Sequence, residues 1–594
     1  MTTRRTLLAS AAALAAAPAL AQAPTPTRPP TPLRKLLDQF AQEELDRSPE
    51  TVTSLGLDKG TRAKQKSLLD DGSLAQQARE RAQVELDLAR LKRVGRSGLS
   101  DAETVDYDVA EYGLSRAQAF NRRFDWSGRP YVLSQLSGAY VGTPDFLDSD
   151  HVIETADDAH AYLARLNGFA TELDQDNERT RHDAGVGVSA PDFALDKTLA
   201  QLRSLRDAPL DKADLVQSLV RRTKEKGIAG DWATPAAAIY RQTVLPALDR
   251  QIALVTELRK TASTDAGVWR LPDGDAFYDM QLKGATTTNL SPAETHALGL
   301  QLVADYSSKA DVIFRSQGIT QGTTGQRLKA LFADPRFLAP NTEAGKAKLI
   351  ADANGRLAGV RAKLPQYFGV LPKAPVEVRR VSPATELGAS THYSSASLDG
   401  SRPGIYWLNL RDTAEVPTWD LWTTTYHEAI PGHHMQISIA QEADIPLYRK
   451  MRGFSAYSEG WALYAEQLAD EMGLYADDPF GRIGYLHDAL LRAVRLVIDT
   501  GVHSKRWSRE RAVAYFSDTL GDPPGMAVSE VERYCVRPGQ ACSYMAGKTS
   551  WLRGRDAARA RLGAKFDIRR FHDAGLTAGS MPLTVLERRL ARYV

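Results

Sequence analysis

One stretch decides the fold of this chain: "TWDLWTTTYHEAIPGHHMQISIAQEA", residues 418–443. We expect a helix that is interrupted at Pro431 and Gly432, because proline lacks the backbone N–H that a helix needs and glycine tolerates unusual backbone angles. Such a break costs about 3 kcal/mol or more unless another interaction offsets the cost. The histidines and the glutamate around the break indicate that a bound metal ion offsets it.

The two residues before the break begin a metal-binding motif. His427 and Glu428 match the start of the metalloprotease pattern His-Glu-x-x-His, but Pro431 stands where the second histidine belongs. If Pro431 and Gly432 loop out, His433 returns to that place. We therefore expect His427 and His433 to bind zinc and Glu428 to face the water that zinc activates. His434 is the alternative ligand, or else it contacts a ligand without binding the metal itself.

The third ligand is expected on the next helix. A catalytic zinc site has three protein ligands and one position open for water. The segment "GFSAYSEGWALYAEQLADEMG", residues 453–473, predicts an apolar helix with Glu459 and Glu466 on one face. Glu459 is the predicted ligand, since a carboxylate in apolar surroundings needs a partner. Glu466 is expected to accept a hydrogen bond from a ligand histidine and so to orient it.

These motifs resemble known families. A His-Glu pair followed by a distant glutamate on the next helix resembles the gluzincin metallopeptidases. More specifically, four blocks together resemble the bacterial family called domain of unknown function 885: "TTYHEAIPGHHMQ", "SEGWALYAE", "DGSRPGIYWLN" and "RPGQACSYMAGK". The resemblance covers roughly the mature chain. It implies a mostly helical, zincin-type hydrolase that holds one Zn²⁺ per chain and whose substrates are largely unassigned.

Hydrolysis at such a site needs a base and a further hydrogen-bond donor. Glu428 would take the proton of the activated water and pass it to the leaving amine. The oxyanion then needs a donor besides the metal ion. Tyr544 is the first candidate, because Pro538-Gly539 is expected to start a helix there and its block is among the family's signatures. His572 is the second candidate.

Three further residues are candidates for binding the substrate. A peptide can be held as an added strand on the edge of a sheet. The segment "SRPGIYWLNL", which contains Tyr406, is expected to supply that edge. Arg402 or Arg537 is a candidate to bind a substrate carboxylate, as arginine does with two parallel hydrogen bonds.

The composition and periodicity indicate a soluble, mostly α protein. The chain has 594 residues, of which 43% are hydrophobic and 25% charged, and its net charge of +2 gives no field that would attract nucleic acid. Helical periodicity dominates, and Ser291, Pro292 and Glu294 form a capping signal. Segment 375–410 instead predicts two or three strands. Further helices are expected over 155–177, 235–260, 343–365, 479–503 and 540–561.

We expect a large multi-helical, zincin-like body with the small β insert, 375–410, beside the active-site cleft. An N-terminal helical lobe over 33–290 and a C-terminal helical lobe over 291–594 would form a single functional unit. Two cysteines, Cys535 and Cys542, lie seven residues apart. On a straight helix that spacing is about 10.5 Å, too long for a disulfide, but Pro538-Gly539 should turn the chain. The sequence therefore allows either a disulfide between the two cysteines or two free thiols.

Residues 1–21 are expected to be an export signal, with Arg4-Arg5, an apolar run and a small-residue cleavage pattern. The paired arginines favour the twin-arginine route over an ordinary secretory signal. The run is too short for a stable membrane span, and the lack of a cysteine near the cleavage site argues against a lipid anchor. Residues 22–32 would form a stiff, proline-rich leader. The mature protein is then periplasmic or secreted.

Together these features predict an exported zinc metallopeptidase that hydrolyses short peptides. One alternative keeps the zinc but changes the bond, to the amide of a non-peptide or cell-wall fragment. Another is a non-catalytic metal- or peptide-binding protein on a peptidase scaffold. Glu428 favours an enzyme, because a binding protein has no need of the base.

Overall fold

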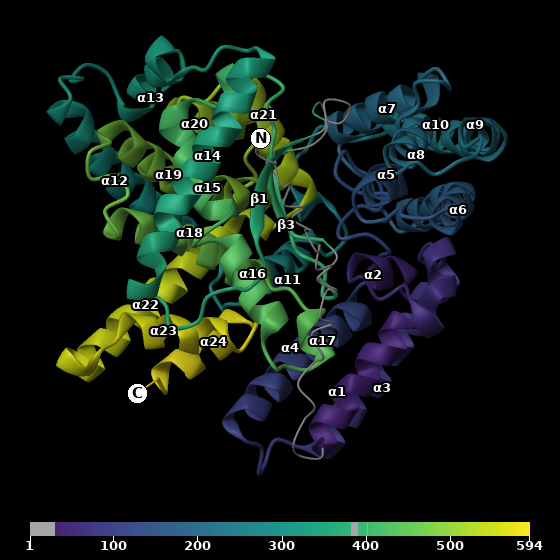
Figure 1. The fold of residues 1–594 in the computed structure, drawn as a ribbon, viewed down its shortest axis with the longest axis horizontal. Helices are drawn as coiled ribbons and strands as arrows, with labels where there is room; N and C mark the ends of the chain where they lie inside the picture. Colours follow the sequence, from purple (N-terminus) through teal and green to yellow (C-terminus); the bar gives the residue numbers. More distant parts are fainter. Residues whose placement is uncertain (1–29, 382–385, 387–389, 401, 594) are drawn as a thin grey trace, which may run out of the picture.

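The computed structural model describes residues 30–381, 386, 390–400 and 402–593, and these form a mostly helical body (Figure 1). The expected export signal, 1–21, and most of the leader lie outside the described residues. No helix among the described residues is long and apolar enough to cross a membrane. Cys535 and Cys542 are separate buried thiols, which answers the question that the sequence left open.

Eleven helices precede residue 290 in the described chain. They are α1 (Pro32–Leu45), α2 (Pro49–Ser54), α3 (Leu74–Val94), α4 (Asp101–Arg123), α5 (Ala139–Ser149), α6 (Ala156–Gly185), α7 (Asp192–Asp207), α8 (Asp214–Glu225), α9 (Ala233–Ile239), α10 (Leu245–Arg259) and α11 (Gly274–Thr286). A short π-helical turn, Tyr240–Val244, joins α9 to α10.

The later helices carry the predicted site. They are α12 (Pro292–Ser316), α13 (Thr324–Phe332), α14 (Glu343–Lys363), α15 (Thr418–Glu428), α16 (His433–Glu442), α17 (Leu447–Lys450), α18 (Ser455–Glu471), α19 (Pro479–His503), α20 (Arg509–Leu520), α21 (Pro524–Val536), α22 (Ser543–Leu562), α23 (Ile568–Leu576) and α24 (Leu583–Ala591). Each helix expected from periodicity is confirmed, and α19 has the expected bounds. The capping box at the start of α12 is also confirmed, with Ser291 and Glu294 bonded reciprocally.

The predicted β insert is a three-stranded sheet in the order β1-β3-β2. Its strands are β1 (Val376–Arg380), β2 (His392–Ser394) and β3 (Gly404–Leu408). β3 is parallel to β1 and antiparallel to β2, so both of its edges are paired. The expectation that this strand offers an edge to a peptide is therefore wrong. Tyr406 lies on this central strand with its side chain buried, so it offers no strand edge to a peptide, and a role of its side chain in substrate binding stays a prediction.

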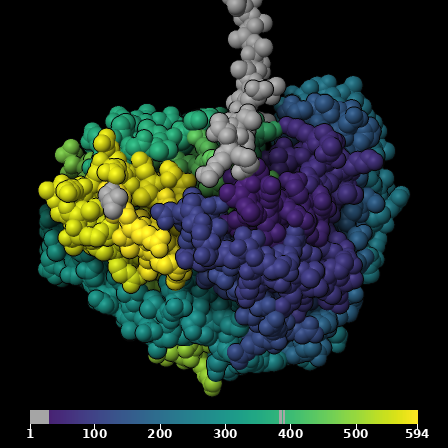
Figure 2. Space-filling view, turned by 90° about the horizontal axis from the view of Figure 1, so that it is seen from below, coloured from purple at the N-terminus to yellow at the C-terminus, as the bar shows by residue number. Residues whose placement is uncertain are grey.

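One continuous cluster of buried side chains runs from α4 to α24, so segments on both sides of residue 290 contribute to it. The lobe boundary at 290 stays a prediction. α19 lies against α12 and α15, and α18 packs along α22. Figure 2 shows the C-terminal segment, in yellow, against the N-terminal helices, in purple and blue. There α24 contacts α4, and Arg588 pairs with Asp108 at 2.9 Å.

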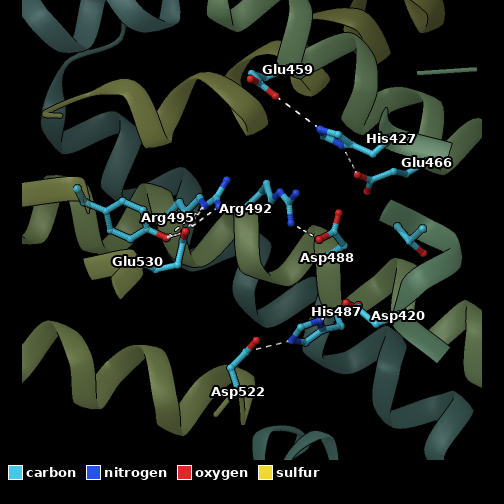
Figure 3. Close-up of polar contacts among 12 residues, drawn as sticks. Asp420, His427, Glu459, Glu466, His487, Asp488, Arg492, Arg495, Asp522 and Glu530 are labelled. Carbon is cyan, nitrogen blue, oxygen red and sulfur yellow. Dashed lines mark hydrogen bonds and ion pairs between the residues drawn. The ribbon is translucent and has the colours of Figure 1, made fainter. Parts of the chain in front are cut away.

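Helix α19 is buried over most of its length, although it carries several charged residues. Its His487 lies between two carboxylates, 3.3 Å from Asp420 and 3.1 Å from Asp522 (Figure 3). Burial alone would lower the pKa of His487, but Asp522 and Asp420 raise it to about 10. A buried charged imidazole of this kind stabilises the fold only while it keeps its proton.

This pair of contacts predicts how stability depends on pH. The pKa of an unfolded histidine is about 6.5, and that of folded His487 is about 10. The stabilisation is thus complete below about pH 6.5 and is lost as the pH rises toward 10, by at most about 1.4 kcal/mol per pH unit. The melting temperature of the wild type should fall more steeply over this range than that of His487→Gln. A variant of the exposed His160, His160→Gln, should keep the wild-type slope, whereas equal slopes in all three proteins would contradict the assignment.

Candidate metal centre

The helix break lies where the sequence predicts it, because α15 ends at Glu428 and α16 begins at His433. Gly432 is required at this point. A Cβ atom there would lie 1.9 Å from the carbonyl oxygen of His427 and 2.4 Å from that of Tyr426. The indole N–H of Trp461 donates to the carbonyl oxygen of Pro431 at 2.9 Å, which ties the break to α18. The looped-out residues are therefore held on both sides.

The break brings the three predicted ligands together. Nε2 of His433 lies 3.3 Å from Oε2 of Glu459, and Nε2 of His427 lies 3.6 Å from the same oxygen. The two imidazole rings are nearly perpendicular, with centroids 4.8 Å apart. Two ligands at about 2.0–2.1 Å from one tetrahedral zinc ion lie about 3.3–3.4 Å apart. The donor types and the spacing of His427, His433 and Glu459 therefore fit Zn²⁺.

Glu466 holds the first of these histidines, in the place expected for it. Its Oε1 lies 2.6 Å from Nδ1 of His427, and both side chains are buried (Figure 3). With Nδ1–H donated to Glu466, the lone pair of Nε2 faces Glu459 and His433. Burial would lower the pKa of His427, but its bonds to Glu459 and Glu466 raise it well above the usual value. A cation is thus favoured between these groups, whether a proton or a metal ion.

The carboxylate of Glu459 is also held in its charged form. Burial would raise its pKa, yet the neighbouring His433 and His427 lower it below the usual value. Glu466 behaves in the opposite way: burial and the nearby Asp488 raise its pKa to about 8. Asp488 in turn forms an ion pair with Arg492. The predicted ligands are thus backed by a second layer of ionisable groups, of which Glu466 and Asp488 are buried and Arg492 is partly buried.

His434 does not join the cluster. Its Nδ1 is bonded to the hydroxyl of Tyr393 at 3.0 Å, and its Nε2 to the carbonyl oxygen of Ala374 at 3.0 Å. Burial lowers the pKa of His434 to about 4, so it stays neutral. Of the two alternatives that the sequence leaves open, the structure brings His433 to the other ligands and uses His434 to tie α16 to the sheet.

The two candidate oxyanion donors have different positions. The ring of Tyr544, in the first turn of α22, stacks beside that of His427 with centroids 6.4 Å apart. His572 is fully buried, and both of its ring nitrogens are occupied, by the hydroxyl of Tyr464 and the carbonyl oxygen of Tyr367 at 2.8 Å each. The structure therefore contradicts His572 as a donor. It packs behind Trp461, on the far side from the ligands.

The two candidate arginines also differ. Arg402 already has partners, since it pairs with Asp150 at 3.2 Å and donates to the carbonyl oxygen of Ser54 at 3.3 Å. Its assignment to substrate binding stays a prediction. Arg537 is exposed and donates to the carbonyl oxygen of Leu136 at 2.9 Å, so its charge has no carboxylate partner among the described residues.

Sequence reasoning missed the charged residues of α19 behind the site. Asp488, Arg492 and Arg495 lie on a helix that is rich in apolar residues and buried over most of its length. Charged groups in such a helix are buried and need partners, and that signal would have drawn attention to them.

The comparisons with known proteins agree with the motifs. The model of the bacterial protein family of unknown function DUF885 matches residues 49–590, so the chain belongs to this family. It is 32% identical to a "putative lipoprotein" from Colwellia psychrerythraea, with a TM-score of 0.90 over 94% of this chain and 98% of that one. A "putative lipoprotein of unknown function" from Shewanella oneidensis shares the fold, at 18% identity and a TM-score of 0.71 over 94% and 99% of the two chains. Among curated proteins, none matches the chain.

The backbone at the break makes a direct prediction. In Gly432→Ala, the added Cβ would collide with the carbonyl oxygen of His427, so the ligand helices must move apart. We expect loss of bound zinc, measured by elemental analysis after dialysis, and a loss of stability of about 1–3 kcal/mol. Gly355→Ala is the matched control, because Gly355 is exposed on α14 and faces open space. A Gly432→Ala protein that holds zinc as well as the wild type would contradict this account of the break.

Proposed function

We propose that this DUF885 protein is an exported, zinc-dependent metallopeptidase that hydrolyses short peptides. The observation that carries the proposal is the triangle of His427, His433 and Glu459, whose donor atoms are spaced as zinc ligands are. Glu428 directly follows one ligand and is only partly buried, as a general base that reaches a substrate must be.

Each of the site residues would have a separate role in peptide hydrolysis. Zinc, when bound by the three ligands, supplies a Lewis acid that polarises a carbonyl group and lowers the pKa of a water molecule. Glu428 takes the proton from the attacking water and delivers it to the leaving amine. Tyr544, which is half-buried beside His427, donates a hydrogen bond to the oxyanion. Glu466 keeps the imidazole of His427 in the one tautomer and orientation that leaves Nε2 free.

Export is part of the proposal. Residues 1–21 have the pattern of an export signal, and Arg4-Arg5 favours the twin-arginine route. Two solved structures with this fold are each described as a "putative lipoprotein", and lipoproteins are a class of exported proteins. These observations support a periplasmic or secreted enzyme.

The role of Glu428 is tested by a substitution that keeps its shape. Glu428→Gln should bind zinc as the wild type does but lose about 100-fold or more of its peptidase kcat, the usual contribution of a general base. Zinc is measured by elemental analysis, and cleavage by mass spectrometry of a peptide library. Glu415→Gln, a change at an exposed glutamate upstream, should leave both unchanged.

Two results would count against the proposal. A Glu428→Gln protein with full activity would remove Glu428 from the reaction. A zinc-loaded wild type that cleaves no peptide would favour the amide of a non-peptide or cell-wall fragment as the substrate.

A further inference from the structure

We propose that four arginines beside the metal centre bind the free C-terminal carboxylate of the substrate, so that the enzyme removes short fragments from the C-terminus of peptides. The arginine cluster consists of Arg492 and Arg495 on α19, Arg533 on α21, and Arg537 at the C-terminal end of α21. This inference rests on the proposed peptidase function and specifies its substrate.

Tyr544 connects the arginine cluster to the metal ligands. One side of the connection is the stack of the Tyr544 and His427 rings, with centroids 6.4 Å apart. On the other, the guanidinium carbon of Arg495 lies 4.6 Å from the centroid of the Tyr544 ring and that of Arg492 lies 5.5 Å from it. In Figure 3, Arg495 and Arg492 lie side by side between Glu530 and Asp488, in the view that also shows His427 and Glu466. The cluster therefore begins one tyrosine ring beyond the ligands.

The cluster holds more positive than negative charge. Arg495 pairs with Glu530 at 2.8 Å, and Arg533 shares the same carboxylate at a longer 3.5 Å. Arg492 pairs with Asp488. The carboxylate contacts of the four guanidinium groups are thus confined to two acidic side chains, since Arg537 donates only to a backbone carbonyl oxygen among the described residues. Three of the four arginines are buried or partly buried, and an excess of positive charge there is costly unless an anion joins it.

Several N–H groups of the cluster also make no hydrogen bond. Among the described residues, Nε of Arg492, Nη1 of Arg495, and Nε and Nη2 of Arg533 are buried and make no hydrogen bond. Buried donors are nearly always bonded in native proteins, so a group of them in one place points to a ligand. A planar guanidinium group offers two parallel N–H bonds, which match the two oxygens of a carboxylate. The side chain of Arg533 is 20% exposed and Arg537 is exposed, so these two arginines of the cluster are reachable from solvent.

The distance between the metal centre and the arginine cluster fits the free C-terminus of a bound peptide. The two ring contacts, 6.4 Å and 4.6 Å, place the guanidinium carbon of Arg495 within about 11 Å of the His427 ring. An extended chain spans about 3.3–3.6 Å per residue, so one to three residues fit between the metal centre and the cluster. This length fits a substrate whose free C-terminus lies one to three residues beyond the scissile bond, so that the product would be a single amino acid or a very short peptide.

The first test compares substrates on the zinc-loaded wild type. An N-acetylated pentapeptide library with free C-terminal carboxylates should be cleaved with a kcat/KM about 10- to 100-fold higher than the same library made as C-terminal amides, the range for hydrogen bonds to a charged group. The products of the free acids should be short C-terminal fragments. Equal cleavage of acids and amides, or cuts far from the C-terminus, would overturn the inference.

A binding measurement decides the matter if no peptide is cleaved. Titration calorimetry with Glu428→Gln protein compares an N-acetylated tripeptide acid with its amide. Binding of the acid that is tighter by tenfold or more supports the arginine cluster as a carboxylate site, even where the peptidase proposal fails. Equal affinities overturn it, whatever the catalytic result.

Variants of the arginine cluster test whether it causes the preference for peptides with a free C-terminal carboxylate. Arg533→Gln leaves the close pair of Arg495 and Glu530 in place and should lower the acid-to-amide ratio of kcat/KM about tenfold. Arg553→Gln, which removes an exposed guanidinium group paired with Glu587 elsewhere on the surface, should keep the ratio. If Arg533→Gln does not fold, as judged by its thermal melt, the exposed Arg537→Gln takes its place. An unchanged acid-to-amide ratio of kcat/KM in the folded variant would show that the arginine cluster does not bind the substrate carboxylate.

Discussion

The candidate metal centre depends on one contact between α15 and α18, the 2.6 Å hydrogen bond of His427 to Glu466. It fixes the imidazole so that Nε2 faces His433 and Glu459, and it does so inside a core where water cannot compete. Removing one partner of a buried pair of this kind typically costs about 3–5 kcal/mol, because the other charge is left alone. The orientation of a predicted ligand is therefore coupled to the packing of the whole helical body.

The same contact explains why α19 carries charged residues through the core. Asp488 lies beside Glu466 and pairs with Arg492, and the next turn brings Arg495 to Glu530. Apolar replacements of buried ion pairs are often neutral or stabilising, so stability alone is a poor reason to keep them. Their position suggests a different role: they hold a line of oriented side chains from the metal ligands to the arginine cluster. Tyr544 lies at the junction, with His427 on one side and Arg495 on the other.

The sequence predicts local features well, because they follow from local rules. Pro431 and Gly432 predict the break between α15 and α16. Hydrophobic periodicity predicts the apolar helix that carries Glu459 and Glu466. Contacts between segments that are distant in the sequence could not be predicted from the sequence. The spacing of His433 and His434 did not decide between them, because the answer depends on how Gly432 closes on the carbonyl oxygen of His427. The strand order that buries Tyr406, the aromatic layer that separates His572 from the ligands, and the meeting of α19 with α21 are tertiary features with no local signal.

The most direct test of the central claim is X-ray absorption at the zinc edge, on the full-length protein loaded with one equivalent of zinc. The account predicts two imidazole nitrogens and one or more oxygens at about 2.0–2.2 Å, from His427, His433, Glu459 and water. In Glu459→Ala protein the two-imidazole signature should be lost or the zinc should not bind tightly. A sulfur ligand, a fully hydrated ion, or a spectrum that Glu459→Ala leaves unchanged would show that zinc does not bind at the break between α15 and α16.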